Sequence, residues 1–344
     1  MRIDEALAYW PENYPRTPVR VAPDPGLINR TYLIGEPPAA VLQWVNPIFD
    51  PLIHLDMDAL TRHLEASGLP TSRLIPTTEG RLWVDDVSGV WRLMTFIEGR
   101  TLSSLTSPSQ AAEAGALIGR FHAAVADWEY ELVSPRRNIH DTPARMKELQ
   151  NALEKADGHP LATQTRDLGT KILGDWQTWD GELDLPERIC HGDLKISNVR
   201  FDHVDRAHCM IDLDTVEPMP FACEMGDAWR SWCNPANEDQ PDQTRFDVET
   251  FVVSARAWLK NAPVLSAAEH RSLVPGIERI CLELAGRFAA DAVNNSYFRE
   301  DLEQHPVAGS HNLLRAKSQL LLARSVRDAR RTCEEALTFF APSA

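Results

Sequence analysis

The sequence predicts an α+β protein with two lobes, of which the first is rich in β-strands and the second is mainly helical. Residues 1–93 contain short alternating apolar runs that are typical of paired strands. From residue 102 onward, long segments repeat apolar residues at helical spacing. A chain of 344 residues is long enough for each lobe to bury a core of its own. A ligand is expected in the cleft between the two lobes.

We expect the first lobe to contain two strand pairs and two helices. The predicted helices lie at residues 3–9 and 50–66, and the predicted strands lie at 31–35, 40–45, 80–86 and 89–97. The last two strands form a hairpin, because residues 86–89 suit a turn between them. We therefore place the first lobe at residues 1–93 and a short connector at residues 94–101.

The second lobe, residues 102–344, is predicted to be helical with one brief return to strands. An amphipathic helix is expected at residues 108–128, with Gly115 and Gly119 on one face. The remaining predicted elements are strands at 198–202 and 208–216 and helices at 246–259, 267–293 and 313–338.

The charge of the chain limits the partners that it can bind. The formal net charge of −15 repels nucleic acids and anionic lipid, and no run of Lys and Arg forms a basic patch. We expect neither nucleic acid nor membrane as a partner. A nucleotide ligand would need a divalent cation between its phosphates and the carboxylates of so acidic a protein. Clustered aspartates therefore indicate a metal site.

The cysteines and the N-terminus predict a cytoplasmic location. Six cysteines are scattered without CxxC spacing, which is typical of reduced thiols in a core. The first ten residues lack an apolar signal core, and no segment approaches the roughly 18 apolar residues of a membrane span. Nothing in the sequence favours a particular oligomeric state.

Two polar stretches carry the candidate chemistry: HGDLKISNVRF at residues 191–201 and MIDLDTV at residues 210–216. Asp193 and Asn198 are five residues apart in the first stretch. Asp212 and Asp214 alternate in the second, which on a strand would point both side chains to the same side. A strand in an apolar run normally buries apolar residues there, so the two aspartates require a functional or structural explanation.

These residues match the requirements of phosphoryl transfer. The reaction needs a hydroxyl held in line, a base to accept its proton, and metal ligands to neutralise the phosphates. Kinases supply a catalytic Asp, an Asn five residues later and an Asp on the next strand. Asp193, Asn198 and Asp212 occur in this order, so we predict that Asp193 is the base and that the other two bind Mg²⁺. Lys195 would stabilise charge on the transferred group.

A structural explanation of each residue alone is also available. The HGD tripeptide can form a turn capped by Asn198, and the two aspartates of IDLD can lie on an exposed strand face. The structural explanation would be preferred for any single residue. The correct order and spacing of all three residues favour the kinase.

Both stretches resemble the signature of the aminoglycoside phosphotransferase/choline kinase-like family, small-molecule kinases with the protein-kinase fold. Further segments, GLINRTYLI, VLQWVN, WRLMTFIEGRTL, HDTPARM, EMGDAWRSWCNP and HNLLRAKSQ, resemble its subgroup of N-acetylhexosamine kinases, which phosphorylate the anomeric hydroxyl. The resemblance implies a bilobal protein-kinase-like fold, ATP and Mg²⁺ as cofactors, and a hydroxylated acceptor of the amino-sugar type.

The resemblance also implies a nucleotide site. Residues 94–97, with Met94 and Phe96, would form the hinge that presents backbone groups to adenine. The segment PGLINRTY would cover the phosphates, with Asn29 contributing in place of the glycines of a GxGxxG loop. Gln43 stands where a phosphate-binding lysine is expected on the third strand, and its neutral amide would bind a phosphate or adenine more weakly than a charged donor.

The acceptor site implied by the resemblance draws on later segments. The candidate residues are His140, Asp141, Arg145, Asp214, Arg230, Arg287, Tyr297 and Arg315. Thr142 and Pro143 equally suit an N-cap and first helical turn, with Asp141 beside the positive end of the helix. Asp214 could assist the metal or the substrate, or simply brace its loop.

Two alternative functions are consistent with the sequence. A kinase of the same family could act on an aminoglycoside, choline or homoserine, since cationic acceptors suit the acidic chain. A nucleotide-binding pseudokinase is favoured by Gln43 and the glycine-poor loop, whereas the complete set of Asp193, Asn198 and Asp212 favours an active enzyme. A pocket walled by His140, Asp141 and Arg230 would indicate a sugar, and an open acidic pocket would indicate a cation.

Overall fold

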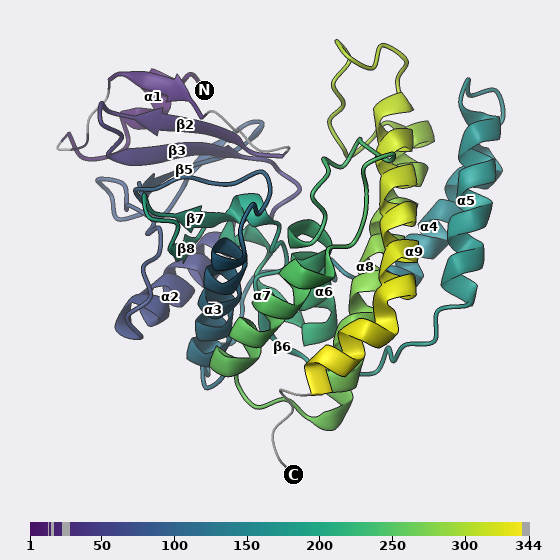
Figure 1. Cartoon of the computed structure of the whole chain (residues 1–344). Helices are drawn as coiled ribbons and strands as arrows, with labels where there is room; N and C mark the ends of the chain where they lie inside the picture. The colour runs from purple at the N-terminus through teal and green to yellow at the C-terminus, as the bar shows by residue number, and fades with distance from the viewer. Residues whose placement is uncertain (13, 15–16, 23–27, 339–344) are drawn as a thin grey trace.

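The computed structural model describes residues 1–12, 14, 17–22 and 28–338. Over these residues a five-stranded antiparallel sheet is followed by a body made mainly of helices (Figure 1). The predicted α+β class, with strands first and helices second, is therefore confirmed. None of the helices in this part of the chain is long and apolar enough to span a bilayer.

The five-stranded sheet has one face packed on a core and one face turned toward the helical body. Its strand order is β1-β2-β3-β5-β4, formed by Val19–Val21, Arg30–Ile34, Ala40–Val45, Gly89–Thr95 and Val84–Asp86. Leu42 and Leu93 are buried on the outer face beside helix α1 (Ile3–Leu7). Because side chains alternate along a strand, Gln43 and Arg92 lie on the inner face, where they pair in the register of β3 and β5.

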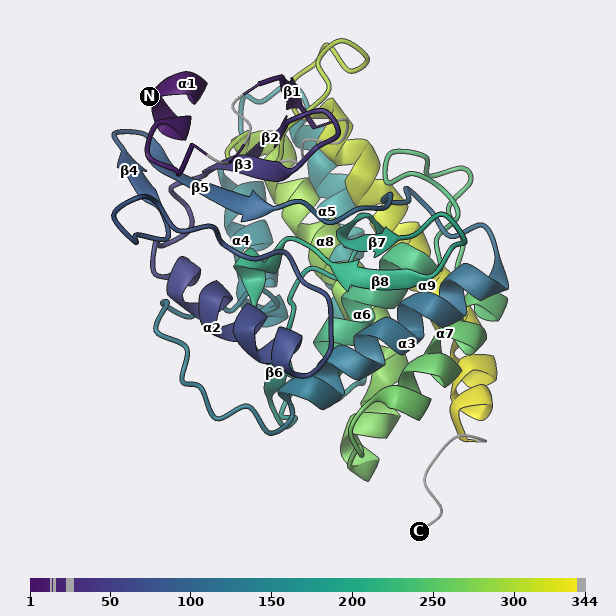
Figure 2. The same cartoon turned by 90° about the vertical axis from the view of Figure 1, so that its left-hand side faces the viewer.

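Helix α2 (Ile53–Ala66) lies beneath the sheet and connects it to the helical body (Figure 2). Its buried stripe includes Met57, Leu60 and Leu64, which join the core of the helical body. The helix follows the predicted segment 50–66 closely. The predicted strand at 80–86 is shorter than expected, since regular pairing begins only at Val84.

The helical body is built around α8 (Ala267–Asn294). Helices α4, α5, α6 and α9 pack against it, at Thr142–Lys155, Ala162–Gln177, Phe221–Trp232 and Ser310–Thr338. Helix α3 (Pro108–Val125) packs along α7 (Val248–Asn261) through the predicted glycine face. This arrangement buries every residue of α6 except Ser231, so that α6 forms a rigid support for the loops above it.

Two short two-stranded sheets flank the polar stretches of residues 191–201 and 210–216. Strands β6 and β9 pair at Arg188–Cys190 and Glu217–Met219, and strands β7 and β8 pair at Val199–Phe201 and Ala207–Met210. The predicted strand at 208–216 is wrong beyond Met210. Asp212 adopts a left-handed backbone conformation with φ of 68°, and the 3-10 turn η2 (Leu213–Thr215) follows it. Asp212 and Asp214 therefore do not alternate on a strand.

Close packing of α6 against α8 generates a test of the fold. A Cβ atom at Gly276 would lie 2.2 Å from the carbonyl oxygen of Ala222, and both are backbone positions held within helices. We expect Gly276→Ala to lower the free energy of unfolding by about 1–3 kcal/mol in urea denaturation. Gly174 on α5 is the matched control, because no described atom lies within 4 Å of a Cβ there. Gly174→Ala should raise the free energy of unfolding by about 0.5–1 kcal/mol. A similar decrease for both variants would contradict the close packing of α6 against α8.

Candidate functional site

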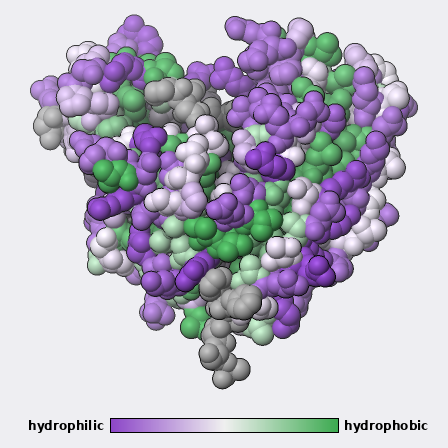
Figure 3. Space-filling view, in the orientation of Figure 1, coloured by the Kyte–Doolittle hydropathy of each residue, from purple (hydrophilic) through white to green (hydrophobic). Residues whose placement is uncertain are grey.

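A cleft of about 1180 Å³ separates the inner face of the sheet from the helical body. Its walls include Gln43 and Arg92 from the sheet, the loop after β6, and residues of α6 and α8. In the space-filling view the molecule is notched between the sheet and the α8–α9 connection, and the rim is largely hydrophilic (Figure 3). The fold thus gathers segments from the whole chain around one cavity.

The predicted catalytic loop forms a hydrogen-bonded unit on the wall of this cleft. Lys195 Nζ donates to Asp193 Oδ2 at 2.6 Å, and Asn198 Nδ2 donates to the same oxygen at 3.1 Å. Gly192 enters the loop with φ of 82°, and a Cβ there would lie 2.4 Å from the carbonyl oxygen of Thr215. The glycine of HGD is therefore required for the loop to approach η2 closely.

Asp193 and Lys195 each stabilise the charged form of the other. Burial alone would raise the pKa of Asp193, but the Lys195 ammonium group outweighs it and the pKa is lowered. Burial would lower the pKa of Lys195, but the charge of Asp193 raises it instead. Asp193 is consequently ionised at neutral pH, as an acceptor of a hydroxyl proton must be.

Asp212 has the opposite electrostatic character. Its carboxylate makes no hydrogen bond or ion pair with any residue that the structure describes. Desolvation in the crowded cleft, followed by the negative charge of Asp214, raises the pKa of Asp212 to about 6. A carboxylate that lacks a partner and is destabilised by its neighbours is one that a cation would stabilise.

The oxygen atoms near Asp212 fit a divalent cation. Asn198 uses its amide nitrogen to bind Asp193, and its Oδ1 accepts no hydrogen bond from the described residues. An amide oxygen and a carboxylate are the ligand types that Mg²⁺ prefers. Asn198 and Asp212 both line the cleft.

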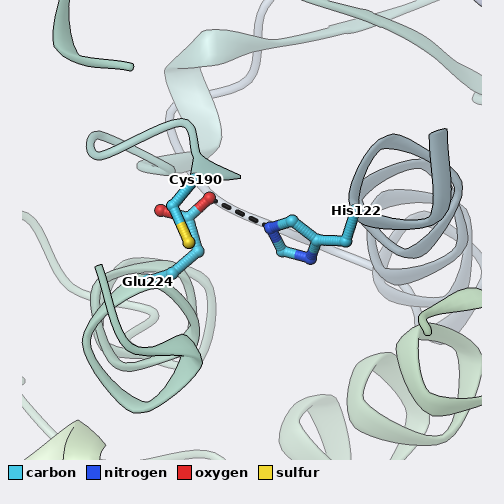
Figure 4. A group of neighbouring side chains, drawn as sticks. All are labelled: His122, Cys190 and Glu224. Carbon is cyan, nitrogen blue, oxygen red and sulfur yellow. Dashed lines mark hydrogen bonds and ion pairs between the residues drawn. The ribbon is translucent and has the colours of Figure 1, made fainter. Parts of the chain in front are cut away.

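The candidate catalytic loop rests on a buried group formed by His122, Cys190 and Glu224 (Figure 4). Glu224 accepts the backbone N–H groups of His191 at 2.8 Å and of Gly192 at 2.9 Å. His122 Nε2 donates to Glu224 at 3.2 Å, while its Nδ1 accepts from Trp258 Nε1 at 2.9 Å. Both imidazole nitrogens and both carboxylate oxygens are thus occupied, so the group braces the loop and has no free ligand atoms on His122 or Glu224 for a metal.

Asp214 lies outside the cleft lining, although it was expected near substrate. Its Oδ1 accepts from Arg92 Nη1 at 2.6 Å, and its Oδ2 accepts from Asn29 Nδ2 at 2.7 Å. Burial would raise the pKa of Asp214, but Arg92 outweighs it and the pKa is lowered. Burial and the charge of Arg92 lower the pKa of His54 on α2 to about 4, which leaves that imidazole neutral.

Arg92 is the residue of this site that sequence reasoning missed. It is the single charged residue in the apolar run GVWRLMTFI of the predicted strand at residues 89–97. The sequence contains a signal for this residue, because a charged side chain on the inner face of a predicted strand needs a buried partner. Identifying that partner required the contact with Asp214, which is 122 residues away.

The nucleotide candidates line the part of the cleft beneath the sheet. Met94, Phe96, Gln43 and Asn29 all contribute to its wall. Gln43 Nε2 donates to Thr31 Oγ1 at 3.0 Å. Residues 25–27 of the predicted phosphate loop lie outside the described residues.

The acceptor candidates separate into two groups. His140, Arg145, Arg230, Arg287 and Tyr297 line the cleft on the side of the helical body. Asp141 and Arg315 are not part of that lining.

The two excluded residues have structural contacts. Asp141 is the N-cap of α4, where its carboxylate accepts from the backbone of Ala144 at 3.1 Å. Thr142, which suited that role by sequence, instead donates its hydroxyl to Glu283. Arg315 donates to the carbonyl oxygen of Arg299 at 3.0 Å.

Most acidic groups on the acceptor side are already paired. Arg230 binds Asp227 at 2.7 Å and Glu238 at 3.1 Å. Glu283 accepts from His140 Nδ1 at 2.9 Å, and although burial alone would lower the pKa of His140, this carboxylate raises it. These contacts leave little free negative charge on this wall.

Several polar atoms on the acceptor side have no partner. The buried atoms His140 Nε2, Arg145 Nε and Asp227 Oδ2 make no hydrogen bond with the described part of the chain. Arg287 lies over the rings of Tyr297 and Phe298, at 5.4 Å from each centroid, and forms no ion pair with a described residue. Buried polar atoms left unpaired are costly, so this wall is suited to a polar ligand.

Comparison with known proteins identifies the family. A model described as the phosphotransferase enzyme family matches residues 20–258 of this chain. The chain belongs to the phosphotransferase enzyme family. The predicted resemblance to the aminoglycoside phosphotransferase and choline kinase-like group is thereby confirmed at this level.

Solved structures share the fold of this family member at low identity. The microcompartment-associated aminopropanol kinase has 16% identity and a TM-score of 0.62, with 95% of this chain and 97% of that chain covered. The choline kinase of Cryptosporidium parvum Iowa II has 13% identity and a TM-score of 0.61, with 98% of each chain covered. The amicoumacin kinase hAmiN, solved with AMP-PNP, Ca²⁺ and Ami, has 14% identity and a TM-score of 0.60, with 92% of each chain covered.

These matches confirm the predicted kinase-like fold. Family membership makes the chain a phosphotransferase, and the kinase neighbours share its fold. The candidate catalytic stretches at 191–201 and 210–216 fall inside the region that the family model matches.

The opposite pKa shifts of two aspartates predict opposite effects on stability. The pKa of Asp212 is raised from 3.8 to about 6, so its ionisation destabilises the folded protein as pH rises through that interval. At pH 7 without metal or nucleotide, Asp212→Asn should raise the Tm by roughly 2–4 °C. The effect is modest because Asp212, although crowded by the other residues of the cleft, keeps part of its surface in contact with solvent, which screens its charge. This gain should disappear below about pH 4, where the carboxyl is protonated in both states.

Asp193→Asn serves as the matched comparison. The lowered pKa of Asp193 stabilises the folded protein above its ordinary value of 3.8, and this contribution is lost as pH falls through the lowered pKa. Asp193→Asn should therefore lower the Tm at pH 7. Thermal unfolding of both variants in EDTA tests the pair, and shifts of the same sign would contradict the assigned electrostatics.

Proposed function

We propose that this phosphotransferase transfers the γ-phosphoryl group of ATP to the anomeric hydroxyl of an N-acetylhexosamine. The observation that carries the proposal is the assembly of Asp193, Asn198 and Asp212 on one wall of the cleft. A base and two oxygen ligands at that wall are the parts that phosphoryl transfer requires. In this proposal Gln43 replaces the usual lysine without abolishing activity.

The nucleotide would lie beneath the sheet, with adenine beside Met94 and Phe96. Residues 1–93 would then form the nucleotide-binding lobe, residues 94–101 the hinge, and residues 102–344 the catalytic lobe. Asn29 and Gln43 would contact the phosphate side of the ligand. The complex of the amicoumacin kinase with AMP-PNP supports a nucleotide in a cleft of this fold.

Asn198 and Asp212 would hold a divalent cation, which we propose is Mg²⁺. The bound cation would neutralise the charge of the phosphates and orient them toward the acceptor. Its binding would also relieve the electrostatic cost of Asp212, whose carboxylate lacks a described partner. The Ca²⁺ in the amicoumacin kinase complex supports a divalent cation in this role.

Asp193 would accept the hydrogen bond of the acceptor hydroxyl. As the hydroxyl oxygen forms its bond to the γ-phosphorus, the bond to the β–γ bridging oxygen breaks, ADP leaves, and the proton passes to Asp193. Because the pKa of Asp193 is lowered, orientation of the hydroxyl precedes complete proton transfer. Lys195, at 2.6 Å from Asp193, would stabilise negative charge on the transferred group.

The charges of the acceptor wall favour a sugar over a cation. Arg145, Arg230 and Arg287 line the cleft, and the carboxylates beside the first two are already engaged: Arg145 binds Glu148, and Arg230 binds Asp227 and Glu238. A cationic aminoglycoside or choline would have to compete with these arginines for the carboxylates. Hydroxyl groups would satisfy the unpaired atoms of His140, Arg145 and Asp227. The rings of Tyr297 and Phe298 would offer an apolar surface to an acetyl group.

A substrate panel tests the proposed reaction. ADP release should be fastest with N-acetylglucosamine or N-acetylgalactosamine, among a set that includes choline, homoserine and an aminoglycoside. Asp193→Asn should reduce kcat by about 10²–10⁴-fold, because the hydroxyl loses its proton acceptor. Asp328→Asn, at an exposed position on α9, is the control and should leave kcat unchanged.

The outcomes of the panel separate the alternatives. Preference for choline, homoserine or an aminoglycoside would refute the hexosamine as the substrate but would still be consistent with a small-molecule kinase. Absence of ADP with every acceptor, despite nucleotide binding, would support the pseudokinase instead.

The role of Arg287 can be tested through the Michaelis constants. Loss of a charged hydrogen-bond donor costs about 1.5–3 kcal/mol, so Arg287→Met should raise the KM of the sugar roughly tenfold or more. The KM of ATP should not change, because Arg287 lies on the acceptor side of the cleft. Arg331→Met, at an exposed position on α9, is the control. An unchanged sugar KM in Arg287→Met would remove this residue from the acceptor site.

A further inference from the structure

A buried arginine occupies the inner face of the sheet beside the position where a lysine was expected. Arg92 on β5 pairs in register with Gln43 on β3. Its Nε and Nη2 atoms donate to Gln43 Oε1 at 2.9 and 2.7 Å. Gln43 contributes no charge of its own, so Arg92 supplies the positive charge at this point of the sheet.

The counter-ion of Arg92 comes from η2 and not from α2. Arg92 Nη1 lies 2.6 Å from Asp214 Oδ1, and each of the two side chains is only 1% exposed. The contact of Arg92 with α2 is to the sulfur of Met57, at 3.2 Å. The buried carboxylate of α2, Asp56, is bound by Tyr130 and by two backbone N–H groups.

Asp214 is held on its other side by the sheet as well. Asn29, immediately before β2, donates to Asp214 Oδ2 at 2.7 Å, and its own Oδ1 accepts the N–H of Asn46 at 3.0 Å. Both oxygens of Asp214 therefore bind residues of the N-terminal sheet region. Asp214 follows the candidate metal ligand Asp212 by two residues, within the short turn η2.

We infer that the Arg92–Asp214 pair fixes the position of Asp212 relative to the sheet and so takes over the task of the absent lysine. A lysine on β3 would contact the phosphates directly. In this protein the sheet would influence the phosphates only through the cation, because it holds the turn that presents Asp212 to that cation. Arg92 is thus a positioning residue. The inference rests on the proposed use of a metal-bound nucleotide.

Removing one charge and removing both charges have different expected effects. Arg92→Met leaves Asp214 buried without its partner and should lower the Tm strongly. The double variant Arg92→Met/Asp214→Asn removes both charges and should recover most of that Tm, since neutral replacements of buried pairs are often tolerated. We expect the double variant to bind AMP-PNP in the presence of Mg²⁺ at least tenfold more weakly than the unaltered protein. Calorimetric titration of the ligand-free protein measures this affinity.

The dependence of AMP-PNP binding on the Mg²⁺ concentration should change only if the Arg92–Asp214 pair positions Asp212, and not if the pair merely stabilises the fold. The concentration of Mg²⁺ that gives half-maximal AMP-PNP binding should rise in the double variant, because Asp212 is no longer held in place. Arg92→Lys, which keeps the charge but not the forked geometry, should be intermediate. Recovery of both Tm and Mg²⁺-dependent affinity in the double variant would overturn the inference.

A second ion pair, in which only the carboxylate is buried, supplies a control away from the cleft. Arg327 on α9 binds Glu278 on α8 at 2.5 Å, and neither residue lines the cleft. Arg327→Met/Glu278→Gln should alter the Tm without changing the affinity for AMP-PNP. Equal weakening by both double variants would overturn a specific role of Arg92.

This test does not depend on the acceptor. An unaltered protein that binds AMP-PNP with Mg²⁺ but phosphorylates no N-acetylhexosamine would refute the proposed sugar and leave the test of Arg92 valid. An unaltered protein that binds no AMP-PNP with Mg²⁺ would overturn both proposals.

Discussion

The site depends on the separation of like charges. The turns at the cleft bring Asp193, Asp212 and Asp214 close together, and their carboxylates repel each other unless each has a partner. Lys195 neutralises the first and Arg92 neutralises the third, at 2.6 Å in both cases. Asp212 is left without a described partner. Two of the three carboxylates are therefore stabilised by cations of the protein itself, and the third is available to a metal.

The helical body and the sheet hold the two halves of this arrangement. From below, Glu224 on the buried helix α6 binds the backbone of His191 and Gly192 and so fixes the loop that carries Asp193. From above, Arg92 and Asn29 bind Asp214 and so fix the turn that carries Asp212. A rearrangement between sheet and body would change the distance between Asp193, the proposed base, and Asp212, the proposed metal ligand. The contacts that stabilise the fold on each side of the cleft therefore also set the relative position of Asp193 and Asp212.

The class of the fold and several elements could be predicted because they depend on local patterns. Periodicity placed α2, α3 and the long helices within a few residues, since an amphipathic helix records its buried face in its own sequence. The strand predicted through residue 216 failed for an equally physical reason. Apolar alternation cannot reveal that Asp212 has φ of 68°, because that conformation is stabilised by contacts of the surrounding loops.

The sequence by itself determined the order of the candidate catalytic residues, the kinase class and the absence of a lysine at position 43, since these follow from residue types and spacing along the chain. Only the tertiary structure decided the partners of those residues. It separated Asp214 from the cleft, assigned Asp141 to the N-cap of α4, and joined Arg92 to a carboxylate 122 residues away. The physical reason is that the energy of a buried charge depends on groups brought near it by folding, and spacing in the sequence does not record those distances.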